Sequence, residues 1–319
     1  MGEKMSKRPK HKHWAIIAAV AMTGVILSSC HNLLGPGSVD YHNKILFTSS
    51  RSGTPQLYMM MNPDGSGVQQ LTTGPYSHYD GKWSPEAKQI VAMTDEDWNT
   101  ACPAHLVVFN VNGTNQKLVG CGGHPSWSPD GKEIAFSYMP RGELGDLTTY
   151  IYAVNLDSGT VEQLTNNTGV IDDDPAWSPD GSTIAFDSDR DYPTGPLRSE
   201  IYLMNPDGSN QRRLTYTDSL INGAPVWSPD GNTIAFKSNG GIALINIDGT
   251  NMRYITHQYE FGFGGYGSPI WSPDGGRLVI LWYPSDGTSH TVIFTLNSDG
   301  SGMKEILDDS TAYATDWSR

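Results

Sequence analysis

A short tryptophan-centred sequence recurs along this chain at intervals of 44 to 50 residues. Its tryptophans are Trp83, Trp127, Trp177, Trp227, Trp271 and Trp317. The first five begin Trp-Ser-Pro, four of these continue with Asp-Gly, and the sixth begins Trp-Ser. A second pattern, an apolar stretch followed by a Gly-containing turn, also occurs six times. A fixed period of this length is typical of repeat proteins, in which each unit packs only on its neighbours. The chain is therefore expected to fold as six copies of one small unit.

The residues within one unit predict four short strands. "PVWSP" and "TIAFKS" alternate apolar and polar residues, as half-buried strands do. Ser-Pro-Asp-Gly between them suits a tight turn, because Pro fixes φ and Gly tolerates the left-handed conformation. "IYLMN" and "QRRLT" flank a second turn, Pro-Asp-Gly-Ser. Four antiparallel strands make one propeller blade. The predicted fold class is therefore all-β: a six-bladed β-propeller of four-stranded antiparallel blades, with each Trp wedged between neighbouring blades.

The combined pattern resembles the repeats of the TolB-like propeller family. It reads WSPDG, then IAF, then IY with MN, then DGS and RLT, and the resemblance covers residues 42–319. It implies a six-bladed propeller that binds proteins. The resemblance extends to the propeller alone, and we expect no counterpart of the smaller α/β domain that precedes the propeller in TolB. The role of TolB in cell-envelope integrity is therefore not implied for this chain.

The two ends of the propeller are expected to share one blade. "KILFTSS" after Asn43 matches the second strand of a unit, since no Trp-Ser-Pro precedes it. "AYATDWS" near the end of the sequence matches a first strand. One blade would then combine three N-terminal strands with an innermost C-terminal strand, which leaves no open edge. Residues 43–319 are assigned to this closed ring.

The N-terminal residues resemble a bacterial lipoprotein signal. A basic segment is followed by 14 mostly apolar residues from Trp14 to Leu27, too few to span a bilayer, and then by Ser-Ser-Cys. We expect residues 1–29 to be the signal peptide, Cys30 to carry the lipid, and residues 30–42 to be a tether. An ordinary secretory signal with an incidental Cys and an uncleaved anchor remain alternatives. The protein is expected outside the cytoplasm. If the bacterium is Gram-negative, the outer membrane is favoured, because His31 is not the Asp that commonly retains lipoproteins at the inner membrane.

The charge of the chain argues against nucleic acid as a partner. Without residues 1–29, 16 of the 21 Lys and Arg and 33 of the 34 Asp and Glu remain, a net charge of −17. An acidic surface repels phosphate backbones. We expect a monomer whose partners are an envelope protein or peptide and, through the lipid, a membrane.

The two faces of the predicted disc differ in their loops. The tight turns hold one face uniform, whereas the other connections vary greatly in length, and variable loops on a rigid scaffold commonly build binding sites. Drift in unimportant loops is the alternative. Three positions before successive tryptophans stand Asp, His, Asp, Ala, Ser and Ala, which predicts a channel mouth that is polar on one half. The candidate binding residues on the variable face are Asp80, Trp98, His124, Arg141, Asp172, Asp173, Asp174, Arg190, Tyr192, His257, Tyr259 and Phe263.

Clustered carboxylates raise the question of a metal. Asp172, Asp173 and Asp174 are consecutive, and a hard cation such as Ca²⁺ prefers carboxylate oxygens. An acidic run is more often solvated or caps backbone amides. We therefore assign no cofactor and keep Ca²⁺ at these three residues as a weak alternative.

The two remaining cysteines are expected to form a disulfide. Export would place Cys102 and Cys121 in an oxidising compartment. Their strands, "PAHLVVFNV" and "NQKLVG", are joined at a turn around Asn112 and Gly113, so hairpin pairing makes the cysteines near neighbours. The bridge would contribute roughly 3 kcal/mol in the chain-entropy model. Two free thiols are the alternative.

Enzyme signatures are missing from the sequence. It contains no Gly-x-Ser-x-Gly elbow and no His-Glu-x-x-His zinc motif. We expect a non-catalytic module of the bacterial cell envelope that binds a protein or peptide. A glycan-binding propeller and a propeller-type polyuronide lyase that uses His and Asp on the variable face are the alternatives.

Overall fold

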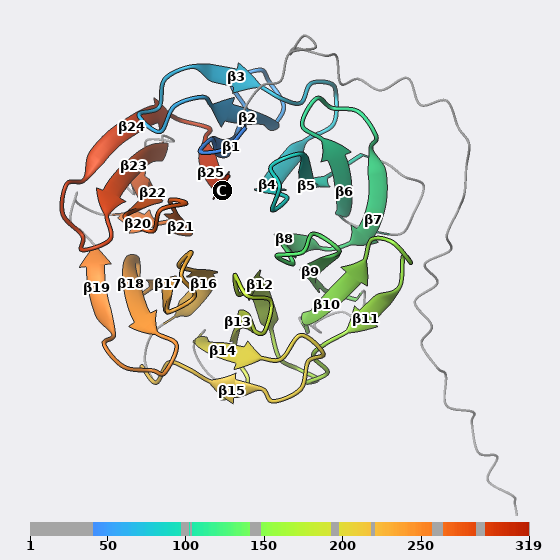
Figure 1. Cartoon of the computed structure of the whole chain (residues 1–319), viewed down its shortest axis with the longest axis vertical. Coiled ribbons are helices and arrows are strands. Elements are labelled where there is room, and N and C mark those ends of the chain that lie inside the picture. Colours follow the sequence, from blue (N-terminus) through green and yellow to red (C-terminus); the bar gives the residue numbers. More distant parts are fainter. Residues whose placement is uncertain are drawn as a thin grey trace, which may run out of the picture.

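The computed structural model describes residues 41–96, 102, 104–140, 148–192, 198–217, 221–256, 264–284 and 291–318. In these residues the chain forms six antiparallel sheets arranged around a central axis, and no helix occurs among them (Figure 1). The predicted all-β, six-bladed propeller is therefore confirmed. No helix in the described part of the chain has the length and apolar character needed to cross a bilayer.

The blades follow one another around the ring in chain order, and in blades 2 to 6 the first strand is innermost. Blade 1 contains β1 (Ile45–Ser49), β2 (Gln56–Met60) and β3 (Val68–Gln70), and blade 2 contains β4 (His78–Trp83), β5 (Gln89–Thr94), β6 (His105–Asn110) and β7 (Lys117–Cys121). Blade 3 contains β8 (Gly123–Trp127), β9 (Glu133–Tyr138), β10 (Tyr150–Asn155) and β11 (Val161–Gln163). Blade 4 contains β12 (Asp172–Trp177), β13 (Ile184–Ser188), β14 (Glu200–Met204) and β15 (Arg212–Arg213).

The last two blades complete the ring. Blade 5 contains β16 (Asn222–Trp227), β17 (Thr233–Ser238), β18 (Gly241–Asn246) and β19 (Arg253–Thr256). In blade 6 the innermost strand is split into β20 (Gly264–Tyr266) and β21 (Ile270–Trp271), and both pieces pair with β22 (Arg277–Pro284). β23 (Thr291–Asn297) and β24 (Lys304–Asp309) follow, and β25 (Tyr313–Trp317) returns to blade 1.

The ring closes through a blade shared by the two ends of the propeller, as predicted. β25 pairs antiparallel with β1 and is the innermost strand of blade 1. The Asn43 amide donates to the Ser318 carbonyl at 3.1 Å, and the Ser318 amide donates to the Lys44 carbonyl at 2.9 Å. No strand of this blade is therefore left open at the centre.

The hydrophobic core is distributed over six interfaces between neighbouring blades. Each interface contains one of the repeat tryptophans; Trp227, for example, packs with residues of blades 4 and 5 such as Ile201 and Ile234. The Trp227 indole also donates to the carbonyl oxygen of Ala176 in the preceding blade at 2.9 Å. The predicted wedging of Trp between blades is confirmed, and it fixes the radial position of every innermost strand.

The turn between the first and second strands uses the same hydrogen bonds in successive blades. In blade 4, Ser178 Oγ donates to Asp180 Oδ1 at 2.6 Å, and the Ser182 amide donates to the same oxygen at 3.0 Å. Gly181 adopts φ 72°, which an L side chain disfavours. Asp130, Asp230 and Asp274 repeat the serine contact in their own turns. This face of the disc is therefore built from nearly identical, internally satisfied turns.

Candidate ligand site at the channel mouth

A bulge near the start of the innermost strand builds the channel mouth. β12 pairs with β13 through Asp173 and Asp187, and the register then shifts before Ala176 pairs with Ala185. Asp174 lies in this shift and adopts a left-handed φ of 50°. A bulge bends the strand and redirects the side chain of the extra residue.

The same bulge recurs in three other blades. β4, β8 and β16 show equivalent register shifts, and Asp80, His124 and Ala224 adopt φ of 50°, 50° and 51° within them. Non-glycine residues seldom adopt this conformation, and such strain clusters at functional sites. The repeat therefore holds one side chain per bulge beside the channel, and its identity changes from blade to blade.

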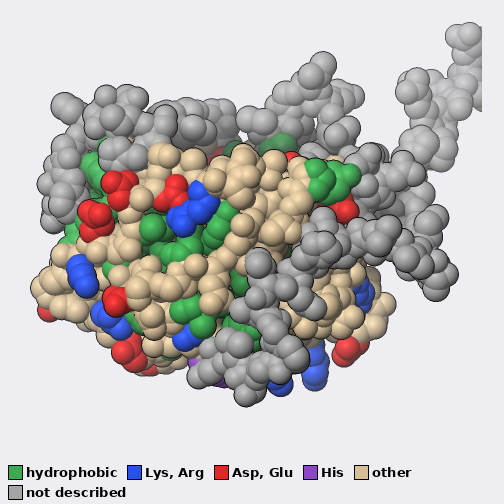
Figure 2. All heavy atoms as spheres, turned by 90° about the horizontal axis from the view of Figure 1, so that it is seen from above, with side chains coloured by type: hydrophobic (Ala, Val, Ile, Leu, Met, Phe, Trp, Pro, Cys, Tyr) green, Lys and Arg blue, Asp and Glu red, His purple; other side chains and the backbone are tan. Residues whose placement is uncertain are grey.

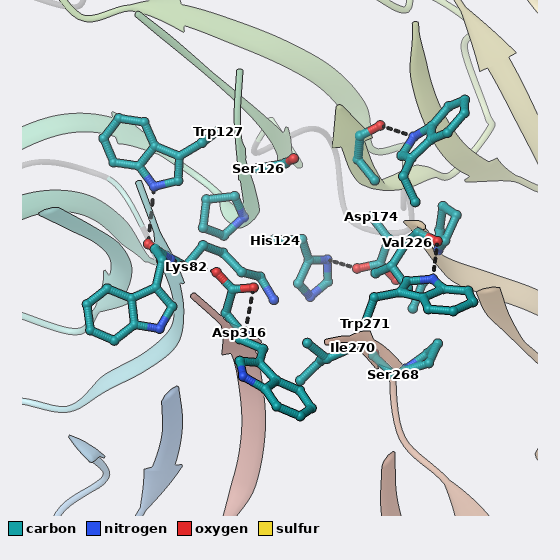
Figure 3. Close-up of a pocket in the computed structure, with 18 of the residues that line it drawn as sticks. Lys82, His124, Ser126, Trp127, Asp174, Val226, Ser268, Ile270, Trp271 and Asp316 are labelled. Carbon is teal, nitrogen blue, oxygen red and sulfur yellow. Dashed lines mark hydrogen bonds and ion pairs between the residues drawn. The ribbon is translucent and has the colours of Figure 1, made fainter. Parts of the chain in front are cut away.

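These residues line a central cavity of about 620 Å³. Its charged lining residues are Asp80, Lys82, His124, Asp174, Lys237 and Asp316, most of them from blades 2 to 4. Small or apolar residues of blades 5 and 6, such as Ala224, Ser268 and Ile270, line the opposite part. In Figure 3, the His124 ring lies between Lys82 and Asp174, and Asp316, Ile270 and Ser268 lie below them in the view. The predicted mouth, polar on one half, agrees with this lining.

His124 is the centre of an ionic cluster. Its Nδ1 lies 2.8 Å from Asp173 Oδ1 and 3.0 Å from Asp174 Oδ1. Attraction by Asp174, together with the hydrogen bond to Asp173, raises the pKa of His124 well above its ordinary value although desolvation opposes the charge. The raised pKa favours the protonated imidazole, in which both nitrogens are donors.

The carboxylates around His124 respond in opposite directions. Burial disfavours the charge of Asp173, but the hydrogen bond from His124, the attraction of its charge and further hydrogen bonds together outweigh burial and lower the pKa of Asp173. Burial and repulsion by Asp173 raise the pKa of Asp174. Asp187 lies behind them in β13, where burial and repulsion by Asp174 raise its pKa well above the usual range. This corner of the channel therefore holds more carboxylates than its single imidazolium neutralises.

A second ionic group lies beside the first. Lys82 Nζ lies 3.2 Å from Asp80 Oδ1, and Asp316 Oδ2 accepts the Trp83 amide at 2.7 Å. Burial opposes the charge of Lys82, but attraction by Asp80 and Asp316 outweighs it and raises the pKa of Lys82. Asp316 thus joins the shared blade to blade 2 while its charge faces the channel.

Three tyrosines add aromatic surface to the same cavity. Tyr79, Tyr283 and Tyr313 come from the neighbouring blades 2, 6 and 1, and all three line the cavity. Burial is the main cause that raises the pKa of each hydroxyl, so the rings stay neutral at physiological pH. The channel is therefore lined by both charged and aromatic side chains.

Three predicted site residues have structural contacts instead. Asp172 is fully buried, and its Oδ1 accepts hydrogen bonds from Ser188 Oγ at 2.6 Å and from Arg190 at 2.8 Å. The Arg190 guanidinium also stacks 4.5 Å from the centre of the Tyr202 ring. The Tyr192 hydroxyl donates to Glu200 at 3.3 Å. None of the three lines the described cavity. Asp172 precedes the bulge, and its side chain is buried against Ser188 and Arg190 within blade 4.

The structure thus brings Asp80, His124, Asp173 and Asp174 together out of the predicted set. Trp98, Arg141, His257, Tyr259, Phe263 and the lipidation residue Cys30 lie outside the described residues. Sequence reasoning missed Lys82, Asp316, Asp187 and the three tyrosines. The sequence did contain a signal for Lys82 and Asp316. The residues directly before the six tryptophans are Lys, Ser, Ala, Val, Ile and Asp in turn, so only the first and the last are charged.

The cluster also bears on the metal hypothesis. One ligand atom each from His124, Asp173 and Asp174 lies within 4.8 Å of the others. A nitrogen with two carboxylate oxygens suits a transition metal better than Ca²⁺, which prefers six to eight oxygens. Asp172, the third member of the proposed Ca²⁺ set, is buried against Arg190. These residues could hold a divalent transition metal only after His124 loses its proton.

The chain was compared with known families and structures. The TolB beta propeller domain family matches residues 101–319. The chain belongs to this family. No curated protein sequence matches it. TolB from Acinetobacter baumannii shares 21% identity at a TM-score of 0.68, over 88% of this chain and 67% of that one.

Two further solved structures share the fold at lower identity. A chain of the nidogen/laminin complex is similar at a TM-score of 0.61 and 11% identity, over 86% of this chain and 97% of that one. An oligogalacturonate lyase from Vibrio parahaemolyticus is similar at a TM-score of 0.55 and 16% identity, over 82% of this chain and 74% of that one. Identities this low establish the shared propeller fold and leave the function to the residues of the channel.

Proposed function

We propose that this chain is a non-catalytic module that binds a protein or peptide at the channel mouth. The observation that carries the proposal is the row of bulges that hold Asp80, His124 and Asp174 in a left-handed conformation around one cavity. Backbone strain of this kind persists where the surrounding structure fixes a side chain for a task. The strained positions carry charged residues on three successive blades, so the binding face is the variable face.

The shape and chemistry of the cavity favour a peptide segment. A volume of about 620 Å³ is in the range of small-molecule pockets, so it accepts a few side chains rather than a folded domain. Charged groups and tyrosines that line one cavity match a segment that carries both polar and apolar side chains. Aromatic residues are also enriched among interface hot spots. The similarly folded chain of the nidogen/laminin complex belongs to an assembly of two proteins, which is consistent with this role.

The proposed setting is the outside of a bacterial membrane. The basic segment, the apolar stretch and the Leu-Ser-Ser-Cys sequence support acylation at Cys30, and a multiply acylated Cys gives stable anchoring where one chain is marginal. The outer membrane is the proposed membrane in a Gram-negative cell. Mass spectrometry of the native protein is expected to find a lipid-modified N-terminal Cys30. An unmodified N-terminus beyond residue 30 would refute the anchor and leave the channel proposal intact.

A pull-down from detergent-solubilised envelope tests the binding function. His124→Ala and Asp174→Asn are expected to lose the captured protein, because both change the ionic cluster without touching the blade core. Asn62→Ala and Asn205→Ala are matched controls, since each Asn bonds only within its exposed tight turn. Loss of the partner with the turn variants alone would place the site on the opposite face and refute the proposal.

A polyuronide lyase is the second candidate function. The observation in its favour is the His124 imidazole between two carboxylates, on a fold shared with an oligogalacturonate lyase. Histidine near neutral pH is a common general acid or base. Unsaturated product from a panel of polyuronides, lost in His124→Ala, would establish the lyase. Binding of a glycan without turnover would instead establish a glycan-binding propeller.

A further inference from the structure

The corner where a blade passes to the next one is closed differently in blade 2. In four other blades a Thr hydroxyl accepts the amide of the third strand: Thr72 from Leu57, Thr165 from Ile151, Thr215 from Ile201 and Thr256 from Ile242, at 2.9 to 3.0 Å. Blade 2 has instead the predicted disulfide between Cys102 and Cys121, whose Cα atoms are 5.8 Å apart. Four blades therefore close the equivalent corner without a covalent bond.

A histidine lies against the disulfide. His105 is the first residue of β6, the third strand of blade 2. The equivalent first residues in blades 1 and 4 are Gln56 and Glu200, which accept hydrogen bonds from Thr72 and Thr215. In blade 2, His105 is instead the direct cross-strand partner of Cys121, and its side chain is buried. One ligand atom each from Cys102, His105 and Cys121 lies within 4.8 Å of the others. Both cysteines are partly exposed, so the group can be reached from solvent.

We propose that Cys102, His105 and Cys121 form a redox-gated site for a thiophilic divalent cation such as Zn²⁺. In the oxidised protein the two sulfurs bond to each other and supply no thiolate. A dithiol reductant opens the site: the S–S bond takes up two electrons and two protons to give two thiols, and the reductant becomes a disulfide. The cation then binds both sulfurs as thiolates, which releases two protons.

The donor set specifies the class of metal. Two thiolates and one imidazole suit Zn²⁺, and a Cys₂His set leaves a fourth tetrahedral position for water. Cys102 and His105 are separated by two residues, within the range of paired zinc ligands in one segment, and the hairpin supplies Cys121 from the adjacent strand. This preference is opposite to that of the cluster of His124, Asp173 and Asp174, where oxygen donors dominate.

Cobalt titration of the reduced and oxidised protein tests the site. The protein is reduced with a trialkylphosphine, which becomes the phosphine oxide, and the phosphine is removed anaerobically before Co²⁺ is added. Reduced wild type is expected to bind one equivalent and to show a thiolate-to-cobalt charge-transfer band with the visible spectrum of tetrahedral Co²⁺. Addition of Zn²⁺ should abolish both signals. Oxidised wild type should show neither.

Variants separate the site from other cobalt binding. Reduced Cys121→Ser and His105→Ala should bind Co²⁺ at least about 100-fold more weakly, since even outer-shell partners of a metal ligand contribute about 10- to 100-fold. Asn62→Ala, in an exposed tight turn outside both clusters, is the control and should keep the full spectrum. A reduced wild type that stays folded by circular dichroism and gives no thiolate band would overturn the proposal. An equal band in folded His105→Ala would also overturn it, because the third ligand would then have no role.

Discussion

The two faces of the disc use the left-handed backbone conformation in different ways. On the tight-turn face mostly Gly and Asn adopt it, as at Gly131, Gly181 and Gly231 with φ of 70° to 73° and at Asn115, Asn210 and Asn251 with φ of 54° to 56°, and Ala87 is an exception at 50°. At the channel mouth, Asp80, His124, Asp174 and Ala224 adopt it with φ of 50° or 51°. Glycine accepts this conformation readily, whereas other residues lose roughly 1–2 kcal/mol in it. The turns thus place this conformation mainly at residues that tolerate it, whereas the mouth keeps strained side chains, three of which are charged.

The two faces also differ in the surroundings of their carboxyl groups. In the turns, Asp180 and its equivalents accept hydrogen bonds from their own serines, which lowers the pKa of each carboxyl. At the mouth, burial raises the pKa of Asp174 and of Asp187, and repulsion by neighbouring carboxylates raises both pKa values further. On the edge of the disc that Figure 2 shows, basic and acidic side chains both occur and no continuous basic patch forms. The excess of carboxylates over basic groups described above lies at the channel.

The largest expected effect concerns a turn glycine. A Cβ at Gly208, where φ is 79°, would overlap the carbonyl oxygen of Leu164 in the preceding blade. Gly208→Ala should lower the free energy of unfolding by about 2 kcal/mol or more, through strain and overlap together. Gly159→Ala is the matched control, since φ is 70° and no atom lies within 4 Å of the added carbon. It should lower the free energy of unfolding by about 1 kcal/mol or less. Urea unfolding of both variants measures the difference, and equal losses would contradict the close packing of turns on neighbouring blades.

At the channel mouth, a glycine substitution is expected to change the free energy of unfolding by a smaller amount and in the opposite direction. Asp174→Gly relieves the left-handed strain by roughly 1–2 kcal/mol and loses roughly 0.5–1 kcal/mol to backbone entropy. It also removes a carboxylate that raises the pKa of Asp187. The variant should unfold at an equal or higher urea concentration, with a gain of up to about 1 kcal/mol, while ligand capture is lost. Clear destabilisation would show that Asp174 serves the fold, and it would remove the contrast between the faces.

The smallest expected effect is a pH dependence centred on His124. Its pKa is raised in the folded protein, so its stabilisation is complete below the unfolded value of about 6.5 and disappears as pH rises through the folded pKa. Asp80, Asp173 and Asp174 are the carboxylates that favour its charge. The difference in unfolding free energy between wild type and His124→Ala should therefore shrink from about pH 6.5 upward. A titration of the His124 ring by NMR gives the folded pKa directly, and an ordinary value would contradict the ionic cluster.

Much of the fold was predictable because the repeat encodes it locally. The Trp-Ser-Pro spacing gave the blade count, the unmatched strands after Asn43 and before Trp317 gave the closure, and the hairpin around Asn112 and Gly113 placed Cys102 beside Cys121. These predictions were possible because the sequence pattern behind each of them lies in residues that are close together in the chain. A pattern repeated six times also averages out local exceptions.

The site was predictable only in part. Asp172, Asp173 and Asp174 are adjacent in sequence, yet Asp172 bonds to Arg190 inside the blade while Asp174 lines the channel. A shift of one residue reverses the direction of a strand side chain, and the bulge that decides the direction here has no distinct sequence signal. Contacts between the shared blade and blade 2, such as Asp316 with Trp83, depend on closure. Sequence proximity therefore identified the region and not the individual side chains.

Site-specific photocrosslinking tests the central claim most directly. A benzophenone residue replaces Ser268, which lines the channel on its uncharged part, or Asn205, which lies in an exposed tight turn. Crosslinking in intact cells followed by mass spectrometry should give a specific protein or peptide adduct from position 268, lost when His124→Ala is added, and none from position 205. A specific adduct from position 205 with none from position 268 would contradict binding at the channel mouth.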